Sequence, residues 1–176
     1  MKFVLEGTET ERLAFTLLTD EYFDQWVELF KEENVARFLG LSPALSPEEL
    51  CKLWFKKIYH RYENELGGMN VLVDKKTGQF IGQCGLLVTE VDEQERLEVG
   101  YATLPKYWGQ GYAAEAAIKC KKLAFERNYA NSLISIVHID NIGSEKVARK
   151  NGMSVEKTID SFKGMPVNIF RINKEE

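Results

Sequence analysis

Two glycines separated by one residue, Gly109 and Gly111, stand directly before a helix-like segment. One face of that segment carries only small side chains at helical spacing: Ala113, Ala116, Ala117, Cys120 and Ala124. The start of a helix has unpaired N–H groups and a partial positive charge. Glycines before it let backbone N–H groups approach a ligand without interference from Cβ atoms. The segment therefore predicts an anion site suited to phosphate.

The glycine pair alone is compatible with other structures. A tight turn from a strand into a helix would also place glycines here. A P-loop is excluded because no Gly-Lys-Ser or Gly-Lys-Thr follows. A dinucleotide-binding Rossmann start is disfavoured, because its third glycine is absent and an antiparallel segment comes first.

The hydrophobic pattern places this loop in a mixed α/β chain that we expect to form a single domain over residues 1–176. An antiparallel meander precedes the loop, and alternating strands and helices follow it. Ser46 and Glu49 predict a capping box, Gly67-Gly68 is expected to end that helix, and Asp20 is expected to cap an earlier one. The expected strands cover residues 12–18, 69–73, 80–88, 97–104, 132–138, 155–162 and 167–172, and the later helices run to about residue 127 and over 141–150.

Composition limits the partners and the surroundings of the chain. The 176 residues are 44% hydrophobic and 28% charged, as in soluble globular proteins. With 23 basic and 27 acidic side chains, the net charge of −4 argues against nucleic acid or an anionic membrane as main partner. The three cysteines lack metal-ligand or disulfide spacing, so we expect no metal. No signal peptide or long apolar run is present, and a cytoplasmic location is expected.

Two blocks of sequence resemble a known family. Glu98-Val99-Gly100-Tyr101-Ala102-Thr103-Leu104-Pro105 followed by Trp108–Ala113 is similar to motif A of the GNAT superfamily of N-acetyltransferases. The closest branch is the Rim type, whose founding members acetylate ribosomal-protein N-termini. Trp108 stands where the superfamily usually has Gln or Arg, and the Rim-type branch commonly carries tryptophan there. A second block, from Asn141 to Met153, resembles the following motif.

The resemblance covers about residues 12–172 and implies the acyl-coenzyme A N-acyltransferase fold, a mixed and mostly antiparallel sheet of six to seven strands flanked by helices. It also implies acetyl-coenzyme A (acetyl-CoA) as co-substrate. By position, the backbone of strand residues 101–103 would hold the pantetheine arm, and the loop that contains the two glycines would wrap the pyrophosphate. The donor-binding residues implied are Tyr101, Ala102, Thr103, Trp108, Gly109, Gln110, Gly111, Tyr112, Ala113, Ala114, Asn141, Ser144 and Lys146.

The reaction implied is direct attack of an amine on the thioester. A lysine-like amine is mostly charged at neutral pH, so a base is useful, and Glu98 is the candidate. Ser144 is the candidate acid or hydrogen-bond donor to the thiolate, because Ala148 occupies the position at which many members carry a tyrosine acid. Each residue also has a structural interpretation: Glu98 as a solvated strand residue, Asn141 as a helix cap, and Ser144 as a first-turn residue.

Three functions are compatible with these features. The first is an N-acetyltransferase acting on a primary amine of a protein N-terminus, polyamine, amino sugar or small metabolite. The second is a non-catalytic acyl-CoA sensor on the same fold. The third, a nucleotide-binding protein unrelated to acyl transfer, would be stabilised by ATP or NAD rather than by coenzyme A. We also consider a homodimer formed through the C-terminal strands or the early helices.

Overall fold

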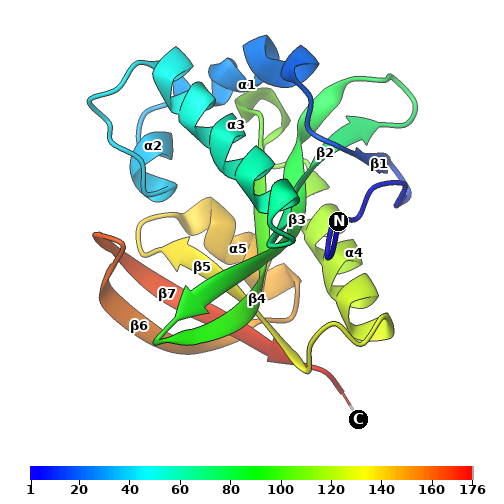
Figure 1. Cartoon of the computed structure of the whole chain (residues 1–176), viewed down its shortest axis with the longest axis vertical. Helices are drawn as coiled ribbons and strands as arrows, with labels where there is room; N and C mark the ends of the chain where they lie inside the picture. The colour runs from blue at the N-terminus through cyan, green and yellow to red at the C-terminus, as the bar shows by residue number, and fades with distance from the viewer. Residues whose placement is uncertain (176) are drawn as a thin grey trace.

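The computed structural model describes residues 1–175, and all of its strands belong to one sheet (Figure 1). The strand order is β1-β2-β3-β4-β5-β7-β6, and only the β4–β5 pair is parallel. The predicted mixed, mostly antiparallel sheet is therefore confirmed. The strands are β1 (Leu13–Thr16), β2 (Gly67–Asp74), β3 (Phe80–Val91), β4 (Gln94–Thr103), β5 (Ser132–His138), β6 (Ser154–Phe162) and β7 (Met165–Asn173).

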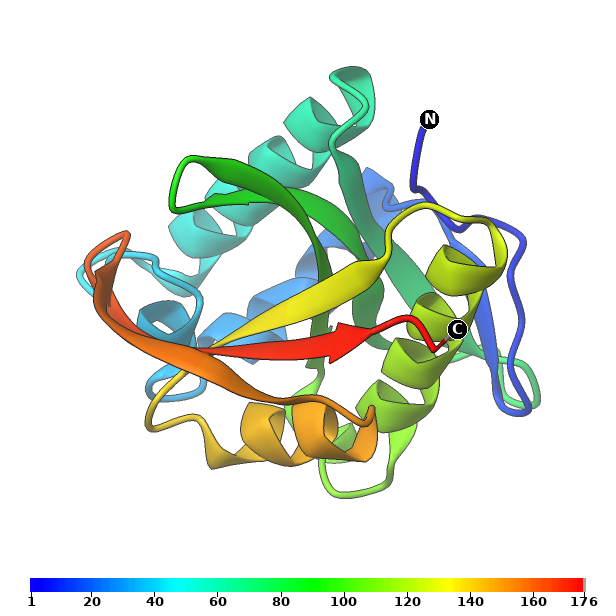
Figure 2. The ribbon, with the colours of Figure 1, turned by 90° about the horizontal axis from the view of Figure 1, so that it is seen from below.

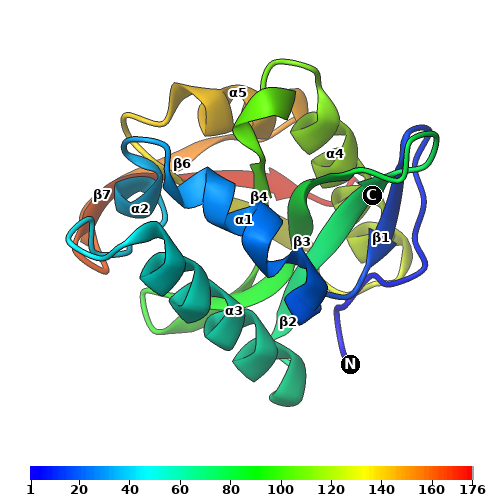
Figure 3. The ribbon, with the colours of Figure 1, turned by 90° about the horizontal axis from the view of Figure 1, so that it is seen from above.

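Helices cover both faces of the sheet. Figure 3 shows α1, α2 and α3 on one side and α4 and α5 on the other. The helices are α1 (Phe23–Phe30), α2 (Val35–Phe38), α3 (Pro47–Glu63), α4 (Tyr112–Glu126) and α5 (Ile142–Lys150), with two 3₁₀ turns, η1 (Asp20–Tyr22) and η2 (Pro105–Tyr107). Within residues 1–175, no helix has both the length and the apolar character needed to cross a membrane.

Each face of the sheet has its own hydrophobic core. The small residues of α4, among them Ala117 and Cys120, are completely buried against β3 and β4, because they let the helix axis lie close to the sheet. On the opposite face Trp26, Phe30 and Trp54 pack together. The two cores fix β4 between helix α4 on one side and helices α1 and α3 on the other.

The capping box at the start of α3 is confirmed. Ser46 Oγ accepts a 3.2 Å hydrogen bond from the N–H of Glu49, and the Glu49 carboxylate accepts one of 2.8 Å from the N–H of Ser46. The expected end of this helix was wrong. The helix stops at Glu63, and Gly67 begins β2. A Cβ atom at Gly67 would lie 1.9 Å from the carbonyl oxygen of Leu86 on β3, so the close approach of the two strands requires glycine here.

Two hairpin turns are tighter than their polar sequences suggested. Asp92 and Glu93 have φ of 51° and 60°, and Lys163 and Gly164 have φ of 50° and 81°. Turns with two left-handed residues match the twist of the flanking strands, so β3, β4 and β7 extend further into the polar segments than predicted. Asp20 does not cap a helix. It lies in η1, and its carboxylate accepts a 2.6 Å hydrogen bond from the Tyr59 hydroxyl.

Candidate active site

Strands β4 and β5 separate after a single paired position. Glu98 is opposite Ile134, and no further residue of β4 pairs with β5, although β5 pairs with β7 from Ser132 to His138. The two strands diverge in Figure 2, where β4 is green and β5 yellow. Within residues 1–175, the C-terminal half of β4 therefore has one edge that no strand covers.

Two side chains mark the ends of this open edge. Ser135 of β5 donates a 2.8 Å hydrogen bond from its hydroxyl to the carbonyl of Val99, and the indole N–H of Trp108 donates one of 2.8 Å to the carbonyl of Thr103. Alternate residues of a strand direct their backbone groups to the same side. The N–H and C=O of Tyr101, midway between them, consequently face the gap.

A cavity of about 590 Å³ opens at this gap. It extends from α1 and α2 across the end of β4 to the first turns of α4 and α5. Most of the residues predicted to bind the donor lie on its wall: Tyr101, Ala102, Thr103, Trp108, Gly109, Gly111, Tyr112, Ala113, Ala114, Asn141, Ser144 and Lys146. Segments separated by some 40 residues in the sequence are thus brought to one cavity by the sheet.

The glycine loop has the geometry expected of an anion site. Gly109 and Gly111 have φ of +73° and +82°, a conformation that residues with a Cβ atom rarely adopt. Gly111 is the N-cap of α4 and no side chain in the described part of the chain caps this helix, so the first N–H groups are available to a ligand. Arg12 holds the loop from outside through a 3.0 Å bond to the carbonyl of Gln110.

Gln110 itself does not line the cavity. Its side-chain amide donates a 3.0 Å hydrogen bond to the carbonyl of Lys106, within the turn that precedes the loop. A backbone contact to the donor stays a prediction for this residue. Its side chain contributes to the shape of the turn.

The start of α5 forms the opposite wall. Asn141 Oδ1 accepts a 3.1 Å hydrogen bond from the N–H of Ser144, so the predicted capping role of Asn141 is confirmed. The hydroxyl of Tyr101 donates a 2.7 Å bond to the carbonyl of Ser144. Burial raises the pKa of this phenol, which therefore stays protonated and keeps the bond at neutral pH. Ser144 and the exposed Lys146 both line the cavity.

Glu98 lies outside the cavity wall. It is half-buried on β4, and the hydroxyl of Thr89, a buried residue of β3, donates a 2.7 Å hydrogen bond to its carboxylate. Glu98 is an even number of residues from Ala102, so both side chains are on the face of β4 that packs toward α1 and α3. Contact with an acceptor amine would need a water molecule or a substrate that extends along this face.

The resemblance also implied that the early helices form one wall of the acceptor cleft, but sequence reasoning did not identify the residues of that wall. It is formed by the end of α1 and the short helix α2, with the residues Leu29, Glu32, Glu33, Val35, Phe38 and Leu39. Arg37 of α2 forms a 3.0 Å ion pair with Asp140, and the rings of Phe38 and His138 are 5.1 Å apart. These contacts join α2 to the loop before α5 and close the cavity on this side. The adjacent acidic pair Glu32-Glu33 was the only local signal.

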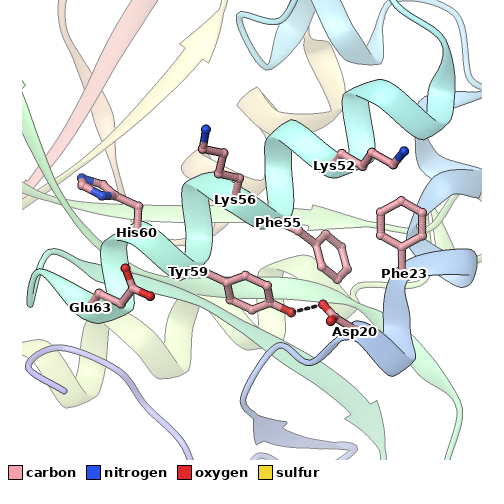
Figure 4. Close-up of a pocket in the computed structure, with 8 residues that line it drawn as sticks. All are labelled: Asp20, Phe23, Lys52, Phe55, Lys56, Tyr59, His60 and Glu63. Atoms are coloured by element: carbon pink, nitrogen blue, oxygen red, sulfur yellow. Dashed lines mark hydrogen bonds between the residues drawn. The ribbon is translucent and has the colours of Figure 1, made fainter.

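A second, open groove of about 440 Å³ lies on the outer face of α3 (Figure 4). Phe23, Phe55 and Tyr59 form its aromatic side, and Lys52, Lys56 and His60 follow one another along the helix. None of the predicted site residues belongs to it. In residues 1–175, no cluster of His, Cys, Asp and Glu side chains could hold a metal ion.

Comparison with known proteins agrees with the geometry. The family model described as "Acetyltransferase (GNAT) domain" matches residues 12–154. YkkB, an uncharacterised protein of Bacillus subtilis, is 38% identical over 97 residues, which are 55% of this chain and 56% of that protein. YoaA, named an uncharacterised N-acetyltransferase of the same species, is 25% identical over 171 residues, covering 94% of this chain and 96% of its own.

Solved structures share the fold over almost the whole chain. An acetyltransferase from Agrobacterium tumefaciens aligns with a TM-score of 0.78 and 23% identity, over 99% of this chain and 98% of that one. Structures of RimL, a ribosomal L7/L12 α-N-protein acetyltransferase, are among the similar folds, in agreement with the resemblance to the Rim-type branch. The chain therefore belongs to the GNAT family and is an acetyl-CoA-dependent acetyltransferase.

Proposed function

We propose that the protein moves an acetyl group from acetyl-CoA to a primary amine by direct attack within a ternary complex. The observation that carries this proposal is the open edge of β4 at Tyr101, which faces a cavity bounded by the starts of α4 and α5. A free strand edge suits the amide-bearing arm of the donor, and a glycine-rich helix start suits its pyrophosphate. The capped start of the second helix suits its thiol end.

The donor would be held mainly by backbone groups. The N–H of Tyr101 is placed to polarise the thioester carbonyl, and the loss of one such donor costs about 3 kcal/mol in other enzymes. The first N–H groups of α4 would bind the pyrophosphate, and Lys146 adds positive charge at the rim of the cavity. RimL, which shares this fold, is described in complex with coenzyme A.

The acceptor would enter from the side of α1 and α2. In the reaction the amine nitrogen bonds to the acetyl carbon, the C–S bond breaks, the amine loses a proton and the thiolate gains one. Glu98 would take the first proton through water, and Ser144 would donate a hydrogen bond to the sulfur. Glu32 and Glu33 on the acceptor-side wall favour an acceptor that carries positive charge.

Two measurements test the proposal. Thiol release from acetyl-CoA is followed with a panel of amines that contains a diamine, an amino sugar, a free peptide N-terminus and a neutral alkylamine. Thermal unfolding is compared with coenzyme A, ATP and NAD at millimolar concentration. We expect stabilisation by coenzyme A and turnover with at least one cationic amine. Stabilisation without turnover would support the sensor, and stabilisation by ATP or NAD alone would support the nucleotide-binding protein.

A further inference from the structure

The open edge of β4 is short and has defined ends. On the β5 side, the carbonyl of Val99 is occupied by the Ser135 hydroxyl and the carbonyl of Thr103 by the Trp108 indole, each at 2.8 Å. Between them lie three backbone groups without a partner in residues 1–175: the N–H and C=O of Tyr101 and the N–H of Thr103. The edge thus offers a donor, an acceptor and a second donor in sequence.

Ser135 occupies the position at which the β4–β5 ladder stops. It follows Ile134, the one residue of β5 that pairs with β4, and it is 1% exposed. A serine that is this buried has few partners to choose from, and its hydroxyl replaces the backbone N–H that a continuing β5 would have offered to Val99. Trp108 is different, because the residue is 51% exposed while its indole N–H donates to β4.

We propose that Ser135 and Trp108 are positioning residues that set the register in which the pantetheine arm pairs with β4. This inference rests on the proposed function, since it needs an amide-bearing arm in the gap. With both carbonyls occupied, the carbonyl of Tyr101 is the single acceptor on the edge. The arm then has one place to bind, and the thioester has one position relative to the N–H of Tyr101.

Removal of the Ser135 hydroxyl creates a second acceptor. The carbonyl of Val99 is two residues from that of Tyr101, a displacement of about 7 Å along a strand. A buried carbonyl of Val99 without a hydrogen-bond partner is unfavourable, so it would accept a hydrogen bond from any new donor within reach. An arm divided between two registers would still bind, but only a fraction of the complexes would place the thioester for attack. A misplacement of about 1 Å can cost a hundredfold in rate.

The test compares Ser135→Ala with Ser135→Cys, which keeps a weak donor of similar size, and with Ser132→Ala on the same strand. For Ser135→Ala we expect kcat to fall at least tenfold while the KM for acetyl-CoA changes less than threefold. Ser135→Cys should recover part of kcat, and Ser132→Ala should match the wild type. Trp108→Phe, which keeps the ring and removes the N–H, should also lower kcat. A Ser135→Ala variant within twofold of wild-type kcat would overturn the proposal.

A second readout needs no acceptor. Amide hydrogen exchange is measured with and without coenzyme A, which should protect the N–H groups of Tyr101 and Thr103 in the wild type. In Ser135→Ala that protection should fall at least fivefold at equal saturation, and unchanged protection would overturn the register proposal alone. Wild-type protein that binds coenzyme A but acetylates no amine would overturn the proposed function alone, because exchange still tests the register. Wild-type protein that does not bind coenzyme A would overturn both.

Discussion

The hydroxyl of Tyr101 donates a 2.7 Å hydrogen bond to the backbone carbonyl of Ser144, and this bond joins β4 to the first turn of α5 across the gap. One residue therefore has two separate tasks. Its backbone faces the cavity at the open strand edge, and its side chain fixes the opposite wall. The distance between the donor's arm and α5 depends on this bond.

Tyr101→Phe should destabilise the fold by about 1 kcal/mol, the usual net value of one buried hydrogen bond. Burial raises the pKa of Tyr101 above 10, its value in the unfolded chain. The stabilisation by this phenol is therefore complete below pH 10 and declines as the pH rises further. Urea unfolding of both proteins at pH 8 and pH 11 measures this. The difference between them should shrink at pH 11, and a constant difference would contradict the assignment.

Gly109→Ala should raise the KM for acetyl-CoA about tenfold, which corresponds to about 1.4 kcal/mol of lost binding. The reason is the φ of +73°, which a residue with a Cβ atom adopts at a cost of about 1 kcal/mol. Gly78→Ala is the matched control: its φ is +72°, a Cβ atom would meet nothing there either, and it lies in the β2–β3 turn and does not line the cavity. Both variants should lose similar stability, but only Gly109→Ala should change KM.

Glu98→Gln should lower kcat/KM by about a hundredfold or more if Glu98 removes the amine proton. Glu95→Gln, on the same strand and exposed, should leave the rate unchanged. If Glu98→Gln kept wild-type activity across the pH range, water or the free amine form of the substrate would suffice.

Glu156 should make the free energy of unfolding of the wild type more sensitive to acid than that of the Glu156→Gln variant. The Arg96 guanidinium, with Arg171 beside it, lowers the pKa of Glu156 to about 2. The stabilisation is complete above the unfolded value near 4.5 and is lost as the pH falls toward 2. Glu156→Gln should therefore cost about 1 kcal/mol at pH 7 and approach the wild type near pH 2. Chemical unfolding from pH 7 to pH 2 checks this, with the exposed Glu11→Gln as control.

Much of the donor half of the site could be predicted from the sequence because its signals are local. Gly109 and Gly111 are needed for left-handed backbone, and Asn141 is a strong cap three residues before Ser144. The order of strands and helices followed from periodicity. The position of Glu98 outside the cavity wall was not predicted. Strand alternation already sets its side chain on the face of β4 opposite that of Tyr101.

The remainder depends on long-range geometry. Ser135 and Thr89 are polar residues of mostly apolar strands, and only the completed sheet shows that Ser135 bonds to a backbone carbonyl and Thr89 to a carboxylate. Helix α2 has four residues, too few for a helical period to be visible, so its place beside the cavity could not be predicted. The residues that line the acceptor wall could not be identified for the same reason.

The single paired position between β4 and β5 has a consequence for the whole molecule. The sheet is continuous in topology, but its hydrogen bonding is nearly interrupted between the four strands β1–β4 and the three strands β5–β7. A molecule that binds along the open edge of β4 would supply backbone partners that the chain itself withholds. The donor would then act as a temporary eighth strand, and the native state would be most firmly assembled when it is loaded for transfer.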